Sequence, residues 1–215
     1  MKKILISLVA FVFATSAFAK QVTLLMDWFP QGNQSGYWQA EFDNRYHTDV
    51  TIKVKAGGPK VNTTTAVASG QVEFGLQASD SVMLANAKGA GLKGIFVSLD
   101  HVPYTLVYHP NTGVNSVKDL DGRPFAVKMG VTYWKWVKHT YGLNKVKEFP
   151  LTGDLGLFAR TPQQFQQGYS LFLPARLDAK GVANEQITVE SLGYRPYSVL
   201  FTTEKMIKEN PELVQ

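Results

Sequence analysis

Short apolar stretches alternate with amphipathic stretches along most of the chain. Residues 21–28 form an apolar run typical of a strand, and Val50, Ile52 and Val54 alternate with polar residues as a half-buried strand does. Further strand patterns lie at 72–76, 95–99, 104–108, 124–128, 168–173, 187–192 and 197–202. Helical patterns lie at 37–46, 59–69, 79–88, 133–141 and 204–210, with a short helix and turn at 116–122 and another helix start at Pro211. This order predicts an α/β fold with mostly parallel strands covered by helices.

A turn-rich segment near the middle of the sequence divides the chain into two predicted lobes. We expect the first lobe over residues 20–108 and the second over 109–196, while 197–215 return to the first lobe. Two α/β lobes joined by crossing strands enclose a cleft, and small ligands bind in clefts of this kind. The crossing strands at 104–108 and 197–202 are the expected hinge.

The first nineteen residues have the pattern of a cleaved secretory signal peptide. Lys2 and Lys3 precede an apolar run from Ile4 to Ala14, and small residues at 17 and 19 suit a signal peptidase. The apolar run is shorter than the roughly 20 residues that a membrane span needs. We therefore expect cleavage before Lys20 and a mature protein in the periplasm.

Composition narrows the possible chemistry. The sequence contains no cysteine, which excludes disulfides, thiolate metal sites and a thiol nucleophile. Removal of the two lysines of the signal peptide lowers the formal charge from +5 to +3, and the basic residues are interspersed with apolar ones, so nucleic-acid binding is not expected. The histidines lack metal-binding spacing, and neither a metal nor a cofactor is expected. They are His47, His101, His109 and His139.

Several segments in the same order resemble one protein family. The stretch LLMDWFPQGNQSGYWQA at 24–40 resembles the start of the NMT1/THI5-like, thiamine-precursor family of periplasmic solute-binding proteins, where a strand ends in Asp-Trp-x-Pro. Similar stretches follow: GGPKVN at 57–62, VASGQVEFGL at 67–76, SVKDLDGRPFAV at 116–127, QQGYS at 166–170 and GYRPYSVLFTTEKMIKENPELV at 193–214. The resemblance implies a type II periplasmic-binding-protein fold and an ABC importer as partner.

Two departures from the family pattern stand out. Members of the family continue beyond a Pro-Glu-Leu-Val element through helices that return to the first lobe, whereas this chain ends at Gln215. We therefore expect the C-terminal helices of lobe one to be missing and apolar surface there to be uncovered. In the second lobe, the family pattern Gly-Tyr-x-x-Ser-Glu-Pro is replaced by residues 168–174, which contain no glutamate. This predicts a different ligand or a different affinity.

The residues that we expect around the ligand are of three kinds. Aromatic rings can sandwich a flat heterocycle, carboxylates can accept charge-assisted hydrogen bonds from its amino groups, and backbone N–H groups of a glycine turn can face an anion. The aromatic candidates are Trp28, Phe29, Tyr37, Trp134, Tyr169 and Tyr194. The polar candidates are Asp27, Ser79 and Asp80, and the glycines are Gly57 and Gly58.

Structural alternatives exist for many of these candidates. Ser79 and Asp80 are also suited to cap the helix at 79–88. Gly57 and Gly58 also suit a tight turn. Trp134 and Trp136 are two positions apart on a predicted helix and cannot share a face. At most one of them therefore points into the cleft, and we favour Trp134.

Patterns of enzyme active sites are absent from the sequence. It has no Gly-x-Ser-x-Gly nucleophile elbow and no His-Glu-x-x-His element. Asp27 beside a histidine would make an acid–base pair, but sequence does not establish proximity. The pyrimidine-synthase branch of the resembling family carries a cysteine-rich motif, which this cysteine-free chain cannot supply. We expect no enzyme.

The sequence thus predicts a monomeric periplasmic protein that captures a small, polar, aromatic nutrient and delivers it to the permease and ATPase of an ABC importer. The Asp-Trp-x-Pro element favours a hydroxymethylpyrimidine-type thiamine precursor. Sulfonate, taurine, nitrate and riboflavin are the alternatives, and an acid at position 27 in the cleft disfavours sulfonates. The rival from another class is a non-transporting sensor-input protein or degenerate fragment.

Overall fold

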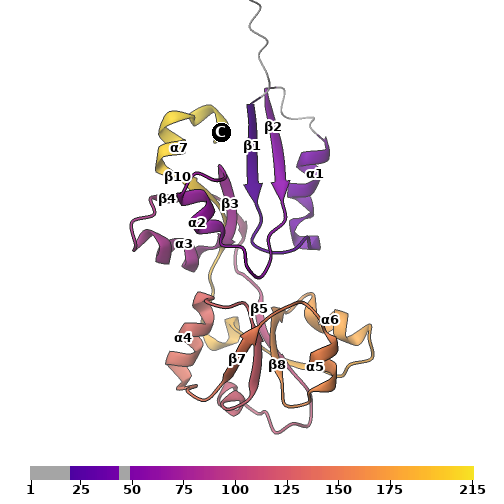
Figure 1. Ribbon diagram of the computed structural model, residues 1–215. Coiled ribbons are helices and arrows are strands. Elements are labelled where there is room, and N and C mark those ends of the chain that lie inside the picture. Colours follow the sequence, from indigo (N-terminus) through magenta and orange to yellow (C-terminus); the bar gives the residue numbers. More distant parts are fainter. Residues whose placement is uncertain (1–19, 44–48) are drawn as a thin grey trace, which may run out of the picture.

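The computed structural model describes residues 20–43 and 49–215, which form two α/β lobes joined by two crossing segments (Figure 1). The predicted signal peptide, residues 1–19, lies outside the described residues. Within the described part, no helix has the length and apolar composition that a membrane crossing requires.

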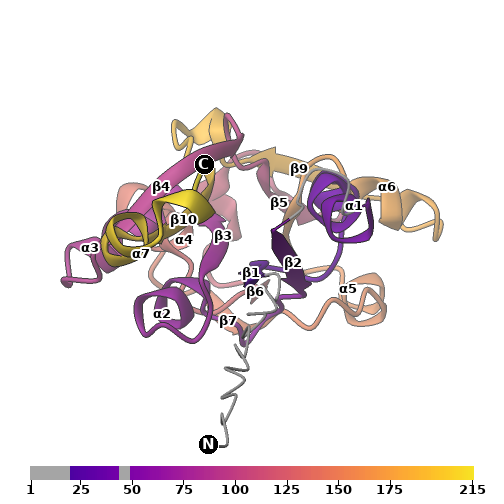
Figure 2. The ribbon, with the colours of Figure 1, turned by 90° about the horizontal axis from the view of Figure 1, so that it is seen from above.

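The first lobe is built on a mixed five-stranded sheet. Its strands are β1 (Lys20–Leu25), β2 (Val50–Lys55), β3 (Phe74–Ala78), β4 (Leu92–Leu99) and β10 (Ser198–Thr203), in the order β2-β1-β3-β10-β4. Strands β2, β1 and β3 are parallel, whereas β10 runs antiparallel to both β3 and β4. The helices around this sheet, seen from above in Figure 2, are α1 (Ser35–Asp43), α2 (Thr63–Ala68), α3 (Ser79–Asn86) and α7 (Glu204–Glu209). Short 3-10 turns lie at η1 (Gly32–Gln34) and η4 (Pro211–Leu213).

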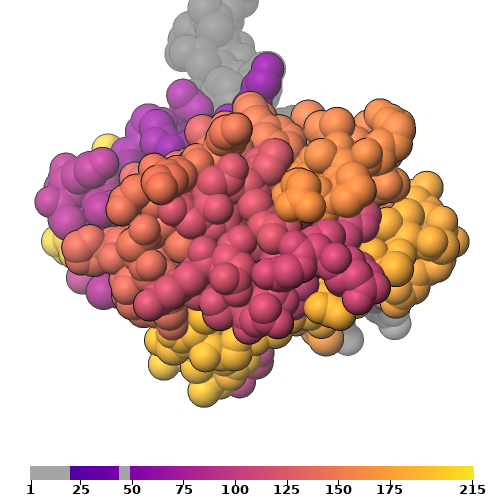
Figure 3. All heavy atoms as spheres, turned by 90° about the horizontal axis from the view of Figure 1, so that it is seen from below, coloured from indigo at the N-terminus to yellow at the C-terminus, as the bar shows by residue number. Residues whose placement is uncertain are grey.

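The second lobe has the same construction. Its strands are β5 (Tyr104–Tyr108), β6 (Pro124–Val127), β7 (Lys147–Pro150), β8 (Phe165–Tyr169) and β9 (Glu185–Thr188), in the order β7-β6-β8-β5-β9. Its helices are α4 (Thr132–Tyr141), α5 (Gly156–Arg160) and α6 (Leu173–Asp178), with 3-10 turns η2 (Val117–Leu120) and η3 (Glu190–Leu192). Residues of this lobe cover most of the molecule's lower face (Figure 3).

The core of the second lobe is aromatic. Phe125 of β6 and Phe165 of β8 are stacked with their ring centroids 4.1 Å apart, and Trp134 of α4 packs on Phe125 at 4.4 Å. All three side chains are buried. Helix α4 ends at Gly142, whose φ of 72° favours glycine because other residues rarely adopt this left-handed conformation. This packing fixes the start of α4, which faces the first lobe.

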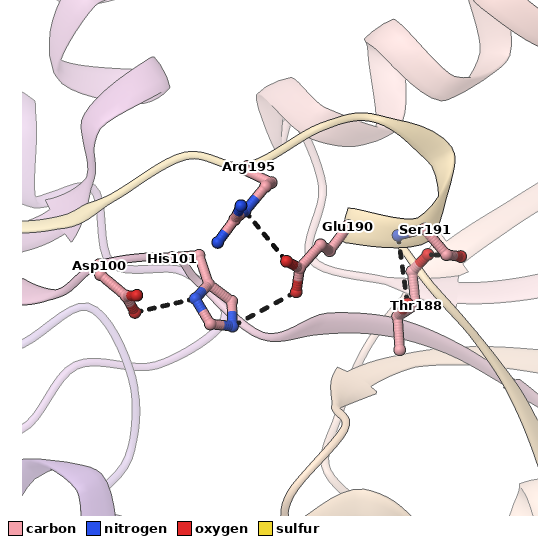
Figure 4. A network of polar contacts seen from close by, with 6 residues as sticks. All are labelled: Asp100, His101, Thr188, Glu190, Ser191 and Arg195. Atoms are coloured by element: carbon pink, nitrogen blue, oxygen red, sulfur yellow. Dashed lines mark hydrogen bonds and ion pairs between the residues drawn. The ribbon is translucent and has the colours of Figure 1, made fainter.

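The two crossing segments run side by side between the lobes. The N–H of Val102 donates to the carbonyl of Pro196 at 2.7 Å, which links the first crossing to the second. Charged side chains bridge the same region (Figure 4): the Glu190 carboxylate lies 3.0 Å from Nε of Arg195 and 3.4 Å from Nε2 of His101, whose Nδ1 is 2.8 Å from Asp100. These contacts connect η3 of the second lobe to both crossings.

Two expectations about the fold need correction. The strand at 104–108 belongs to the second sheet, where β5 pairs with β8 and β9, so the first lobe ends before Tyr104 rather than at Tyr108. The expected strand at 168–173 is the end of β8 followed by the start of α6. The prediction of mostly parallel strands is confirmed, because in each sheet only the strand that arrives by a crossing, β10 or β5, runs antiparallel to both of its neighbours.

The first lobe also exposes apolar side chains on its edge strand. Phe96 and Val97 of β4 are 59% and 52% exposed. Both side chains belong to the strand at the edge of the first sheet.

Candidate functional site

A cleft of about 460 Å³ lies between the two lobes. Its walls come from the segments that follow β1, β2 and β3 in the first lobe and β6, β7 and β8 in the second. Ligands of open α/β sheets bind outside the carboxyl ends of the strands, and this cleft lies between two such edges. The fold therefore provides a cleft to which both lobes contribute side chains.

Asp27 is the only acidic side chain among the described residues that line the cleft. It follows the buried Met26 just beyond β1, and its Oδ1 accepts a hydrogen bond of 3.2 Å from Nε2 of Gln34. Burial raises the pKa of the Asp27 carboxyl, although the charge of Lys128 and the bond from Gln34 oppose this rise. The interactions within the protein thus do not fully offset the cost of removing the Asp27 carboxylate from water.

Lys128, at the end of β6, reaches from the second lobe to the first. Its Nζ donates to the carbonyl oxygen of Asp27 at 3.0 Å and lies 5.6 Å from the ring centroid of Trp28, a cation–π distance. Its own backbone N–H is held at 2.8 Å by Oε1 of Gln167 from β8. Lys128 therefore connects the lobes at the position where the cleft is lined by Asp27 and Trp28.

Two tyrosines form another part of the wall. The rings of Tyr104 and Tyr169 meet edge to face with centroids 5.6 Å apart, and both residues line the cleft. Burial, and then the negative charge of Asp27, raise the pKa of the Tyr169 hydroxyl. This hydroxyl stays protonated at neutral pH and is available as a hydrogen-bond donor.

Three of the predicted ligand residues line the cleft: Asp27, Trp28 and Tyr169. Their contact with a ligand remains a prediction. Leu173, which stands where the resembling family pattern has glutamate, also lines the cleft and is 6% exposed. The second lobe thus places an apolar side chain, rather than a second acid, at that position.

The other predicted aromatic residues do not line the cleft. Trp134 is only 2% exposed and belongs to the core of the second lobe, so our preference for it over Trp136 was wrong. Trp136 packs on Tyr194 instead, with ring centroids 4.9 Å apart. Tyr37 packs against the core of the first lobe, and Phe29 is 46% exposed beside Trp28. Spacing alone did not show which side of each helix faces the neighbouring sheet.

The glycine turn has a structural role. The N–H of Gly57 donates to the carbonyl of Trp28 at 3.0 Å, so it is not available to a ligand. A Cβ at Gly57 would lie 2.1 Å from the carbonyl oxygen of Met26, and a Cβ at Gly58 would lie 3.3 Å from the Phe29 ring. The turn after β2 therefore packs tightly against the turn that carries Asp27.

Ser79 and Asp80 connect the lobes beside the cleft and do not line it. The Ser79 hydroxyl oxygen accepts from the N–H of Tyr197 in the crossing segment at 3.0 Å. The Asp80 carboxylate accepts from the hydroxyl of Tyr194 in the second lobe at 2.8 Å and from the N–H of Ser81 at 2.6 Å. Burial raises the pKa of Asp80. Asp80 and Tyr194 thus form an interlobe contact rather than a ligand contact.

Two groups of cleft residues were missed at the level of sequence. The first is cationic: Lys60, Lys88, Lys128, Lys135 and Arg176. The second consists of glutamines: Gln31, Gln77, Gln166 and Gln167. The two glutamines of β8 are buried although they are polar, and their position in the strand-like run QQGY was the available signal.

Comparison with known proteins shows which sequences this chain resembles. A sequence model of the family described as NMT1/THI5 like matches residues 33–215. A curated relative in Legionella pneumophila, 4-amino-5-hydroxymethyl-2-methylpyrimidine phosphate synthase, is 27% identical over 118 residues, which cover 51% of this chain and 35% of that protein.

Solved structures share the fold at low sequence identity. The alkanesulfonate-binding protein from Xanthomonas axonopodis pv. citri, bound to MOPS, is similar with a TM-score of 0.70 at 15% identity, over 91% of this chain and 69% of that one. The periplasmic aliphatic sulphonate binding protein from Escherichia coli is similar with a TM-score of 0.64 at 14% identity, over 91% and 65%. The chain therefore spans about a third of the curated relative and about two thirds of these solved chains. Since the family model covers most of the sequence, the chain belongs to the NMT1/THI5 like family.

Proposed function

We propose that this protein is a periplasmic, non-catalytic substrate-binding component of an ABC importer, and that its ligand is an amino-substituted pyrimidine of the hydroxymethylpyrimidine type. The observation that carries this proposal is the convergence of a buried acid and aromatic rings in one cleft between two lobes. Asp27, Trp28 and Tyr169 all line that cleft. Its volume of about 460 Å³ is suited to a small organic molecule.

Hydrogen-bonding groups in the cleft favour a ligand that donates. Oε1 of Gln31, which lines the cleft, is buried and has no hydrogen-bond partner among the described residues. The Asp27 carboxylate is a second acceptor, and its burial strengthens any charge-assisted bond that a ligand makes to it. An exocyclic amino group offers two donors, so it satisfies two acceptors where a sulfonate, which only accepts, satisfies neither.

The comparisons support the same assignment at a coarser level. The matching family model is described as NMT1/THI5 like, and the name of the Legionella relative contains the aminopyrimidine itself. The similar solved structures are named as binding proteins, and one of them, from Streptococcus pneumoniae, is named as the substrate-binding protein of an ABC uptake transporter. The likeness to binding proteins supports capture between lobes and delivery to a membrane permease, whereas the Legionella relative is named as a synthase.

Isothermal titration calorimetry with 4-amino-5-hydroxymethyl-2-methylpyrimidine tests the proposal. The protein starting at Lys20 is titrated with this pyrimidine, with taurine and with an alkanesulfonate. We expect binding of the pyrimidine and at least a tenfold loss of affinity in Asp27→Asn, because an amide replaces the charged acceptor. Asp49→Asn changes an exposed acid that does not line the cleft and serves as the matched control. Binding of the sulfonates without the pyrimidine contradicts the ligand assignment.

A second variant separates stacking from hydrogen bonding. Trp28→Ala removes a ring that lines the cleft and should weaken pyrimidine binding by roughly 0.5–1.5 kcal/mol beyond the lost apolar area. Phe42→Ala removes an aromatic ring of α1 that is 83% exposed and does not line the cleft. Equal effects of the two substitutions contradict a stacking role for Trp28.

A further inference from the structure

The charge of the cleft is strongly unbalanced. Five cationic side chains line it, and Asp27 is the single acid among its described lining residues. None of the five has a carboxylate of the described residues within 4.0 Å. Elsewhere in the described part, lysines such as Lys53 and Lys93 do have such a carboxylate, at 2.7 Å and 2.9 Å. The cleft therefore has an excess of positive charge that the protein itself leaves uncompensated.

The cations come from both lobes. Lys60 and Lys88 belong to the first lobe, and Lys128, Lys135 and Arg176 belong to the second. When the lobes approach each other, like charges approach across the cleft, which opposes closure. An anion between them replaces this repulsion with attraction to both walls. The distribution of charge thus favours a ligand that carries negative charge.

Lys128 is the best-placed member of this group. It is half-buried, whereas the other four are exposed, and its neighbours hold it at the boundary between the lobes. An ammonium group has three donors, and the carbonyl of Asp27 uses one of them. Desolvation lowers the pKa of Lys128, and the opposing charge of Asp27 offsets this fall only in part.

We propose that Lys128 anchors an acidic substituent of the ligand, such as a phosphate, and that the cations around the cleft make the protein selective for an anionic form of its ligand. This inference rests on the proposed function for the ring and deepens it by naming the charge of the ligand. The amino side of the ring is bound by Asp27 and Gln31, and the acidic substituent is bound by Lys128. It also revises the expectation that the acid in the cleft disfavours anions, because one acid is outnumbered by the cations.

A matched pair of probes separates this inference from the proposed function. The two probes are 4-amino-5-hydroxymethyl-2-methylpyrimidine and its phosphate ester, titrated by calorimetry into the protein starting at Lys20. Binding of the neutral alcohol tests the ring, and the ratio of the two affinities tests the acidic group. We expect the phosphate ester to bind about tenfold tighter or more. Its affinity should fall as NaCl is raised from about 50 to about 500 mM, while that of the alcohol stays nearly constant.

Variants of Lys128 locate the effect. Lys128→Gln should abolish most of the preference for the phosphate ester, read as the ratio of the two affinities, because the charge-assisted contact to the acidic substituent is lost. Lys128→Arg keeps the charge and should restore at least part of the preference. Lys118→Gln, a change outside the cleft, is the control for loss of one positive charge. Circular dichroism and thermal melts establish that each variant is folded.

Each outcome is decisive. Equal affinity for the alcohol and the phosphate ester overturns the inference and leaves the proposed function standing. A preference that Lys128→Gln retains overturns the assignment to Lys128. Absence of binding by both probes at millimolar concentration overturns the ring assignment and the inference together.

Discussion

Gly57→Ala tests whether the close packing of two turns supports the candidate site. Gly57 follows β2, and its N–H donates to the carbonyl of Trp28 at 3.0 Å. A Cβ added there would lie 2.1 Å from the carbonyl oxygen of Met26 and 2.5 Å from the backbone of Asp27 and Trp28. All of these are backbone atoms, which cannot rotate away as the end of a side chain can. The turn that carries Asp27 and Trp28 must therefore shift.

The magnitude follows from the size of the overlap. Real Cβ contacts are almost never shorter than 3.0 Å, so the two turns must separate by about 0.9 Å. Overpacking of this kind costs about 1–3 kcal/mol. Loss of the hydrogen bond to Trp28 adds about 0.5–1.5 kcal/mol. We expect a destabilisation of about 2–4 kcal/mol, which for a chain of this size corresponds to a fall in Tm of roughly 5–15 °C.

Gly36→Ala is the matched control. Gly36 lies in α1, and a Cβ there would meet no atom within 4 Å. The same chemical change should stabilise the protein by about 0.5–1 kcal/mol, because alanine favours a helix more than glycine does. Calorimetric or fluorescence-detected melts of both variants give the comparison, and titration with the aminopyrimidine reports on the site. If Gly57→Ala melts within about 2 °C of the wild type, the reasoning from the close approach is refuted.

Three further predictions concern a buried acid, a pair of tryptophans and the crossing segments. Burial raises the pKa of Asp27 in the folded state, so the folded protein is more stable when this carboxyl is protonated. This contribution to stability is fully present below the pKa of Asp27 in the unfolded chain, and it is lost as pH rises through the pKa in the folded state. Asp27→Asn should accordingly gain in Tm relative to the wild type as pH rises from about 4 to about 7, and a difference in Tm that does not change with pH would contradict this account. Trp134→Ala should destabilise the protein by about 3–5 kcal/mol in urea unfolding, because the side chain is 2% exposed in an aromatic core. Trp28→Ala should mainly reduce ligand affinity. The reverse pattern would mean that the two roles are exchanged. Glu190→Gln removes the charge that faces Arg195 and His101 at the crossing segments. Because these side chains are partly exposed, we expect a loss of stability below about 1 kcal/mol in urea unfolding. A loss above about 2 kcal/mol would show a stronger coupling between the crossings.

Much of the fold could be predicted because periodicity reports directly on burial. The alternation of Val50, Ile52 and Val54 predicted β2. Elements with weak patterns were missed, including β7, α5 and α6, which have four to six residues each. A segment this short buries too few side chains to leave a periodic signal.

The pairing of β5 was not predictable from its own residues. All five residues of this strand are buried, so its sequence reads as a central strand in either sheet. Its membership in the second sheet is decided by partners more than 50 residues away, β8 and β9. The border between the lobes was therefore misplaced by one strand.

The site was only partly predictable, for a related reason. Asp27 and Trp28 follow a strong strand, and side chains at the carboxyl end of a parallel strand face the ligand crevice. Trp134 lies two residues from the helix start, where no pattern distinguished the face toward Phe125 from the face toward the cleft. Lys128 resembled any surface lysine in the sequence.

The sequence by itself determined the α/β class, the presence of two lobes and the acid–aromatic pair after the first strand, because local hydrophobic periods and the order of elements are properties of the chain alone. Only the tertiary structure decided which side chains meet in the cleft. Lys128 and Asp27 are 101 residues apart, and they meet because two crossings place the carboxyl ends of both sheets face to face. Contacts of such long range depend on lobe placement and side-chain direction, which no local pattern encodes.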